Sequence, residues 1–394
     1  MPQFKCGEMN QVKQSDFLIK RRYEAFVFII LFFGFFGYLG HAMGVTNLLN
    51  TIMNTAWDLL MNTVFYIMGI TVLSGALGRL MIEFGVVRLL EFVLAPLMRP
   101  LFNLPGVASL AGLMTFFSDN PAIISLSNDK NFSSYFKKHE LISLTNFGTA
   151  FGMGLIVITF MTGFGYFSSA MIGLVGALAG AIISTRLMQR LIKNEPALQN
   201  GLKVNDEGES RLSFRSEGGA FLRFLNAILD GGKQGVNLGL AIIPGVLIIS
   251  TMIMIITFGP ADPSVGYQGL AYEGVPVLPE IAGYIWWLFE GLFGFTEPEL
   301  IAFPITSLGA VGAALSLVKA FVAEGYITGN EIAVFTAMGM CWSGYLSTHT
   351  AMLDTLNFRA LTPKALIAHT AGGIFAGAFA HYLYVLLQYV GVMG

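Results

Sequence analysis

The chain has 394 residues, of which 55% are apolar and 12% charged, whereas about 25% of the residues of an ordinary soluble domain are charged. This deficit excludes a soluble enzyme. The net charge of −2 provides no basic field for nucleic acid, so nucleic acid is not an expected partner. Several uncharged stretches are long enough to cross a bilayer. The sequence therefore predicts an all-α polytopic membrane protein.

The N-terminal residues 1–23 are expected to be cytoplasmic. Basic residues gather on the cytoplasmic side of a membrane, and this segment carries Lys5, Lys13, Lys20, Arg21 and Arg22. No small-residue cleavage site follows, so the first apolar run is an anchor rather than a removed signal peptide. Spans are predicted at 24–44 and 52–78. Charges recur at short intervals among the apolar residues of 80–104, which predicts an interfacial amphipathic helix.

The next apolar stretch, 106–127, is interrupted by Ser118, Asp119, Asn120 and Pro121. Lysines follow it, and a re-entrant hairpin that enters and leaves on one face keeps them cytoplasmic. Irregular backbone at membrane depth survives where protein or a wet cavity covers it. The alternative is a membrane helix that is merely kinked by proline. Spans at 140–163 and 166–188 follow.

Residues 194–217 are polar and without period, which predicts a cytoplasmic linker between two halves, 24–193 and 218–394. In the second half we expect a short amphipathic helix at 218–233 and spans at 235–258, 330–352 and 365–391. A second broken apolar stretch covers 297–322.

An internal repeat relates the two halves. A shift of 191 residues aligns 97–155 with 288–346 without a gap and gives 13 identities in 59 positions, against roughly five expected by chance. The charge distribution places the first hairpin on the inner face and the second on the outer face. The sequence therefore predicts inverted-topology repeats, each with an interfacial helix, a broken re-entrant hairpin and transmembrane helices, as in secondary transporters.

Four segments resemble the nucleoside-recognition or Gate-domain family of membrane proteins: Gly235–Ser250, Leu292–Glu299, Ser307–Leu315 and Thr328–Glu331. Related folds include the spore maturation proteins A and B, the membrane part of ferrous iron transporter B and, more distantly, the concentrative nucleoside transporters. The resemblance covers about 50–190 and 235–390 and implies two fused Gate units whose hairpins meet at the midplane. The hairpin signatures of true nucleoside transporters are absent, so the resemblance does not determine a substrate. With no P-loop, energy is expected to come from an ion gradient.

Ionisable residues at membrane depth are functional candidates because burying them is costly. Asp119 and Asn120 at the first break are predicted to bind substrate, with Asp119 also binding a coupling ion; helix capping is the alternative. Glu297 and Glu299 flank a proline at the second broken stretch. We count both as substrate ligands and Glu297 as a second coupling-ion ligand, although carboxylates in a first turn often only complement the helix dipole.

Polar residues inside the predicted spans complete the candidate site. Thr145, Asn146 and Thr336 offer neutral hydroxyl and amide groups, and helix–helix hydrogen bonding is an equally common use of such groups. Trp342 could stack on a planar solute while Ser343 and His349 supply hydrogen bonds. Anchoring at the membrane interface is the alternative for the tryptophan and the histidine.

Together these features predict an ion-coupled secondary transporter of a small polar organic solute, nucleoside-like by resemblance. It is expected in the cytoplasmic (inner) membrane of a bacterium. The predicted partners are the solute and the lipid bilayer. Coupling to Na⁺ or H⁺ is expected, with no cofactor and no resident metal. A metal or inorganic ion transporter and a non-transporting assembly factor remain alternatives. No nucleophile–base pair indicates an enzyme, and a homo-oligomer stays open.

Overall fold

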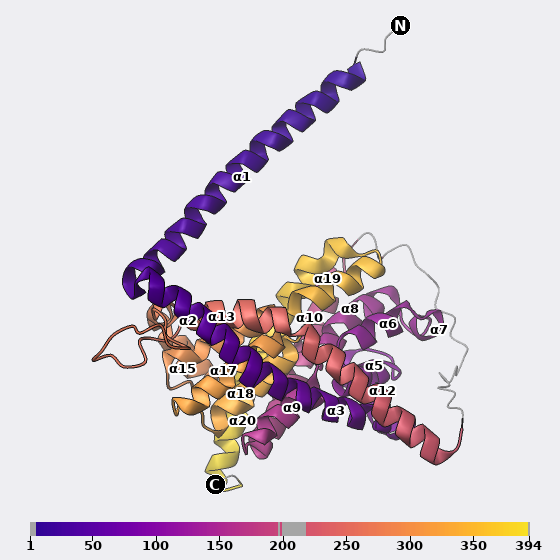
Figure 1. Cartoon of the computed structure of the whole chain (residues 1–394). Coiled ribbons are helices and arrows are strands. Elements are labelled where there is room, and N and C mark those ends of the chain that lie inside the picture. The colour runs from indigo at the N-terminus through magenta and orange to yellow at the C-terminus, as the bar shows by residue number, and fades with distance from the viewer. Residues whose placement is uncertain (1–4, 196–197, 199–217, 393–394) are drawn as a thin grey trace.

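The structure, a computed structural model, describes residues 5–195, 198 and 218–392, and within these ranges it is helical with no strand (Figure 1). The all-α prediction is confirmed. Most of the predicted linker 194–217 and the first four residues of the predicted N-terminal segment 1–23 lie outside the described residues.

The first half is built from ten α-helices and one π-helical turn, η1, among the described residues. Their bounds are α1 Lys5–Met43, α2 Val45–Asp58, η1 Leu59–Val64, α3 Phe65–Glu83, α4 Val86–Phe102, α5 Ala108–Phe117, α6 Pro121–Asn128, α7 Lys130–Ser133, α8 Lys138–Thr149, α9 Gly154–Gly163 and α10 Phe167–Ile192.

The second half is built from nine α-helices, one π-helical turn and two 3₁₀-helical turns among the described residues. Their bounds are α12 Ala220–Ala241, η2 Gly245–Ser250, α13 Thr251–Ile255, α14 Val277–Gly283, α15 Trp286–Phe293, η3 Pro298–Ile301, α16 Ala302–Gly309, α17 Val311–Ala323, α18 Gly329–Cys341, α19 Tyr345–Thr355, η4 Arg359–Leu361 and α20 Thr362–Tyr389.

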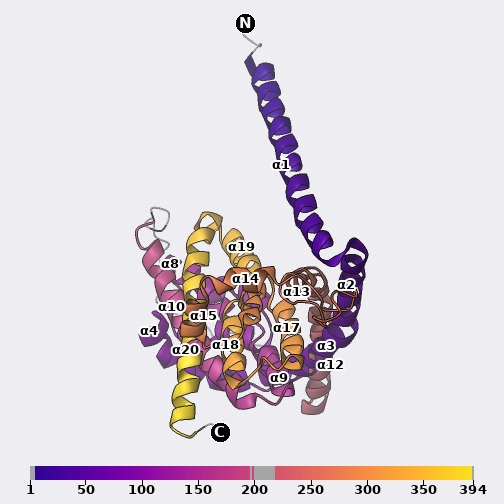
Figure 2. The same cartoon turned by 90° about the vertical axis from the view of Figure 1, so that its left-hand side faces the viewer.

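Six helical segments of the described chain are long and apolar enough to cross a membrane. They are Arg21–Met43, Val45–Glu83, Lys138–Gly163, Phe167–Ile192, Ala220–Ile255 and Arg359–Tyr389. Helix α1 projects away from the other helices (Figures 1 and 2), and its aromatic residues, such as Phe26, Phe28 and Phe33, are more than 60% exposed. So much contiguous apolar surface is stable in lipid rather than in water, which fits a multi-pass membrane protein.

Three expected boundaries are wrong, and one of them is the predicted span at 140–163, which is two helices, α8 and α9. The separate helix at 218–233 does not exist, because α12 runs unbroken from Ala220 to Ala241. Its glycines make a stripe on which α3 packs: a Cβ placed on Gly235 would lie 2.3 Å from the carbonyl oxygen of Thr71. The predicted span at 330–352 is in fact two helices, because the chain turns at Gly344, whose φ of 65° is left-handed.

Helix starts recur between the halves at the shift found in the sequence. Helix α8 begins at Lys138 and α18 at Gly329, while α9 begins at Gly154 and α19 at Tyr345 (329 − 138 = 345 − 154 = 191). In both halves a helix is therefore interrupted at the equivalent position, between α8 and α9 in the first half and between α18 and α19 in the second.

Left-handed backbone recurs at the same shift. Asn103 and Gly294 close α4 and α15 with φ of 54° and 66°, and Met153 and Gly344 precede α9 and α19 with φ of 56° and 65° (294 − 103 = 344 − 153 = 191). A left-handed residue other than glycine is uncommon, so shared positions point to a common backbone plan. The opposite membrane orientation of the two halves stays a prediction.

Candidate functional site

Asn120 lies at the tip of the first broken hairpin, between α5 and α6. Its side chain is buried, and its Nδ2 donates to the carbonyl oxygen and the Oγ of Ser343, at 3.1 and 3.2 Å. Glycine lets the tip approach closely, because a Cβ on Gly152 would lie 2.4 Å from the Asn120 Oδ1. The tip of one half thus contacts the broken helices of both halves.

Three chain breaks surround one cavity of about 380 Å³, which we call the central cavity. They are the tip of the first hairpin, the α16–α17 junction, where Ala310 is extended, and the α18–α19 junction at Gly344. The lining residues are Asp119, Asn120, Pro121, Ile124, Met153, Leu238, Ala241, Ile242, Gly245, Gly309, Ala310, Val311, Gly312, Ser343, Gly344, Ser347, Thr348 and Ala351. Half-helix ends leave backbone groups that need partners, so all three junctions supply polar backbone to one space.

A second space, the lateral cavity, adjoins the central cavity on the side of α3 and α12. It measures about 500 Å³ and shares Asp119, Pro121, Leu238 and Ala241 with the central cavity. Gln234, Asn237 and Arg79 add polar groups to its wall. Asp119 therefore stands where the two cavities meet.

Several polar atoms around these cavities have no protein partner within the described residues. The Asp119 Oδ1, the Asn120 Oδ1 and the Arg79 Nε are buried without a hydrogen bond. An unpaired buried polar group costs about 1–3 kcal/mol, so such groups are satisfied by water, an ion or a ligand. Asn120 makes no cap bond at the start of α6, which removes capping as the use of its side chain.

The chemistry of the central cavity is that of a site for a neutral or cationic polar molecule. Neutral donors and acceptors come from Asn120, Ser343, Ser347 and Thr348, and Asp119 is the one carboxylate in the lining. Aliphatic residues of α12 and α17 close the remaining walls. Such a mixture orients a small solute through a few polar contacts.

Three predicted ligands lie elsewhere. Thr145, Asn146 and Thr336 are fully buried and line neither cavity. The Asn146 Nδ2 donates to the Ser184 Oγ at 3.0 Å and to the Ala365 carbonyl oxygen at 2.9 Å. It therefore joins α8 to α10 and α20, so the structure favours the helix–helix alternative for this residue.

Trp342 and His349 are also not among the residues that line the central cavity, and their role as substrate ligands stays a prediction. The Trp342 indole is buried and donates to the His369 carbonyl oxygen at 3.2 Å, so its face is not open to a solute. His349 is fully buried against His369, with ring centroids 4.5 Å apart. On α19 the residues Ser347, Thr348 and Ala351 line the cavity, whereas His349 packs on His369 of α20.

The acidic pair of the second hairpin is remote from the tip. Glu297 and Glu299 flank the start of η3, and neither lines either cavity. Thirteen residues separate Glu297 from Ala310 at the tip, which at a helical rise of 1.5 Å is about 20 Å. Their assignment as substrate ligands stays a prediction, and the central cavity does not support it.

Ser347 and Thr348 line the central cavity; the sequence indicates Ser347 as a hydrogen-bonding group beside Ser343, whereas Thr348 is not among the predicted ligands. The spacing of four between Ser343 and Ser347 was the available signal, since such residues share a helical face. Within the described residues no group of three or more His, Cys, Asp or Glu side chains is arranged to hold a metal.

No protein-family model matches the sequence. Over 107 residues the chain is 34% identical to the sporulation integral membrane protein YlbJ of Bacillus subtilis, a match that spans 26% of this chain and about a quarter, 25%, of that relative's length.

Solved structures give a match over nearly the whole chain. CNTnw in an inward-facing substrate-bound state has a TM-score of 0.54 and 14% identity, covering 93% of this chain and 86% of CNTnw. A variant of CNTnw in an outward-facing state has a TM-score of 0.53 and 13% identity, with coverage of 95% and 87%. The predicted relation to the fold of the concentrative nucleoside transporters is confirmed. This chain has the fold of a concentrative nucleoside transporter.

Proposed function

We propose that this chain is a secondary transporter that moves a small polar organic solute across the cytoplasmic membrane, with the N-terminus inside. The convergence of three chain breaks on the central cavity carries the proposal. Discontinuous helices that meet at one site are how many secondary transporters bind solute and ion, because half-helix ends supply unpaired backbone groups.

Asp119 is the proposed coupling site. It is the one carboxylate of the central cavity, its Oδ1 has no partner among the described residues, and it also faces the lateral cavity. A cation bound there would satisfy the buried oxygen, and freed carbonyls at the tip would complete its coordination. A hydroxyl-rich solute is the proposed cargo, since Asn120, Ser343 and Thr348 are neutral donors and acceptors.

A thermal unfolding panel on the purified protein tests this function. Nucleosides, bases, dipeptides, organic acids and divalent metals are added singly, with and without Na⁺ and at two pH values. A ligand that binds only the folded state raises the Tm by mass action. The solute that shifts the Tm is then followed in uptake by proteoliposomes.

Variants of two buried asparagines provide the matched comparison. Asn120→Ala and Asn146→Ala each remove a buried amide that bonds between helices, but only Asn120 lines the central cavity. We expect the Asn120 variant to lose the solute-induced Tm shift and uptake while the Asn146 variant keeps both. Equal behaviour of the two variants would contradict the assignment of the cavity.

A second candidate is a membrane component of sporulation that transports nothing, which the segment similar to YlbJ favours. It predicts that no compound in the panel shifts the Tm and that Asp119→Asn leaves every flux unchanged. A divalent metal as the sole hit would instead favour transport of an inorganic ion.

A further inference from the structure

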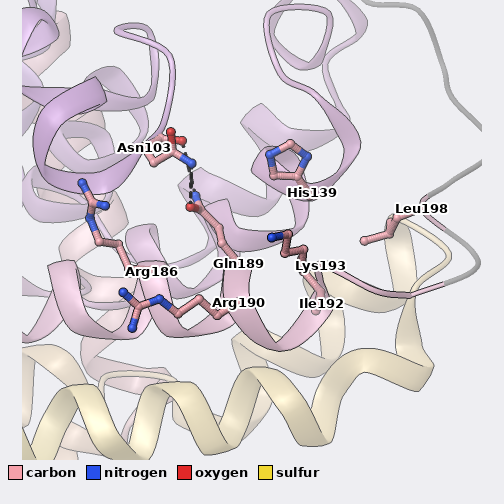
Figure 3. A pocket seen from close by; sticks show the side chains of 8 residues that line it. All are labelled: Asn103, His139, Arg186, Gln189, Arg190, Ile192, Lys193 and Leu198. Atoms are coloured by element: carbon pink, nitrogen blue, oxygen red, sulfur yellow. Dashed lines mark hydrogen bonds between the residues drawn. The ribbon is translucent and has the colours of Figure 1, made fainter.

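A pocket of about 460 Å³, the basic pocket, opens at the ends of α4 and α10 and shares no lining residue with the central cavity. Its lining residues are Asn103, His139, Arg186, Gln189, Arg190, Ile192, Lys193 and Leu198. Three of them are permanent cations and none is acidic. Gln189 and Lys193 extend from the end of α10 toward Asn103 and His139 (Figure 3).

The cations of the basic pocket differ in what holds them. Arg186 donates its Nε to the Leu101 carbonyl oxygen at 2.6 Å, so it joins α10 to the end of α4. Arg190 and Lys193 are exposed and form no ion pair with any residue that the structure describes. By contrast, the neighbouring cation Arg99 is paired with Glu140 at 2.5 Å. Among the described residues, positive charge without an acidic partner is therefore concentrated at this pocket.

An apolar groove of about 330 Å³ lies between the same helices. Helix α4 contributes one stripe of side chains at a spacing of four: Leu90, Leu94, Met98 and Phe102. Helix α10 contributes Leu174, Val175 and Leu178, of which Val175 and Leu178 are 44% and 39% exposed. Exposed aliphatic residues leave this groove open to the surrounding lipid.

The groove and the basic pocket follow one another along both helices. On α4, Phe102 of the groove is adjacent to Asn103 of the pocket; on α10, Leu178 of the groove is eight residues before Arg186. Eight residues of α-helix rise about 12 Å, which is the scale of a headgroup region next to hydrocarbon. An amphiphile with an anionic head and an apolar tail matches this order.

We propose that this face binds an anionic phospholipid, with its phosphate headgroup in the basic pocket and an acyl chain in the apolar groove. Basic pockets between membrane helices at the cytoplasmic side are suited to anionic headgroups, and the predicted topology places the end of α10 on that side. A free phosphate would use the pocket and leave the groove without a function. Helix-dipole compensation alone explains basic residues at the end of α10, but it does not explain the adjoining groove.

Thermal unfolding of the full chain in detergent tests the proposal, with phosphatidylglycerol, phosphatidylcholine and glycerol phosphate as separate additions. We expect only phosphatidylglycerol to raise the Tm. The double variant Arg190→Gln, Lys193→Gln should need a roughly 30-fold higher phosphatidylglycerol concentration for the same rise in Tm, because each removed charge contributes about 1 kcal/mol to lipid binding. The single variant Lys193→Gln should weaken it roughly fivefold and serves if the double variant folds poorly.

The matched control is the double variant Lys233→Gln, Lys319→Gln, which removes two exposed cations elsewhere. It should keep the rise in Tm with phosphatidylglycerol. Leu178→Trp fills the groove and should weaken the phosphatidylglycerol effect without changing any of the pocket's cations. Equal responses to phosphatidylcholine, or equal loss in the control variant, would overturn headgroup recognition. A Tm rise with glycerol phosphate as large as that with the lipid, or no effect of Leu178→Trp, would overturn the lipid assignment in favour of free phosphate.

Discussion

Replacing Gly344 by alanine should specifically damage the contact between the hairpin tip and the α18–α19 junction. Gly344 has φ of 65°, and a Cβ there would lie 2.2 Å from the Thr348 Oγ1 and 2.4 Å from the Asn120 Nδ2. The left-handed conformation costs about 1 kcal/mol for a residue with a Cβ. Displacing the Asn120 amide also removes its two hydrogen bonds to Ser343, worth about 0.6 kcal/mol each between membrane helices.

The sum is a loss of about 2 kcal/mol in the free energy of unfolding. Gly85→Ala is the matched control, because Gly85 has φ of 78° with nothing within 4 Å of an added Cβ, so it should lose only about 1 kcal/mol. Equilibrium unfolding in detergent with added dodecyl sulfate measures both losses. Equal losses in the two variants, or solute binding that survives in Gly344→Ala, would refute the proposal that Gly344 permits the contact between Asn120 and the α18–α19 junction.

Further predictions concern the α3–α12 crossing and the loop before α14. Gly235→Leu should prevent folding, because even a Cβ there would lie 2.3 Å from the Thr71 carbonyl oxygen. Gly232→Leu is the control, since its added Cβ would have only one neighbour, at 3.7 Å. The control should leave the yield of folded protein unchanged in size-exclusion chromatography. Glu273→Gln should expose this loop to protease, because the buried carboxylate accepts backbone N–H bonds of 2.8–3.4 Å from several loop residues; unchanged cleavage would contradict this. Burial and the hydrogen bond to Asp58 raise the pKa of Tyr272 above its usual range. The extra stability of the wild type over Tyr272→Phe should therefore be complete below about pH 10 and shrink as the pH rises further, and unfolding measured across that range checks the sign.

The capping boxes show where local sequence is sufficient. Glu140 and Glu331 lie in the first turns of α8 and α18, and each carboxylate accepts the backbone N–H of the residue three positions earlier, Lys137 and Thr328, at 2.8 Å in both cases. Both acids therefore cap their own helices. Such bonds join residues of one turn, so the sequence contains everything they need.

The buried histidine cluster shows where local sequence is insufficient. Trp342, Ser343 and His349 belong to one short polar run, yet only Ser343 reaches the central cavity. His349 packs on His369, and His369 Nδ1 lies 3.0 Å from the Ser184 Oγ. Which of these side chains faces the cavity depends on how α19 is rotated against α20, and the turn at Gly344 determines that rotation.

The order of residues along the chain was sufficient to determine that this is an all-α membrane protein, where the apolar stretch 106–127 is interrupted and at what shift the halves repeat. Those features follow from hydropathy, helix-breaking residues and spacing, which act within a few turns of chain. Only the tertiary structure decided that Asn120 meets Ser343 across 223 residues of sequence, that Glu297 lies away from the tip and that Asp119 stands between two cavities. Contacts between distant segments depend on how closely the helices approach one another, and at Gly152, Gly235 and Gly344 that approach depends on the absence of a single Cβ.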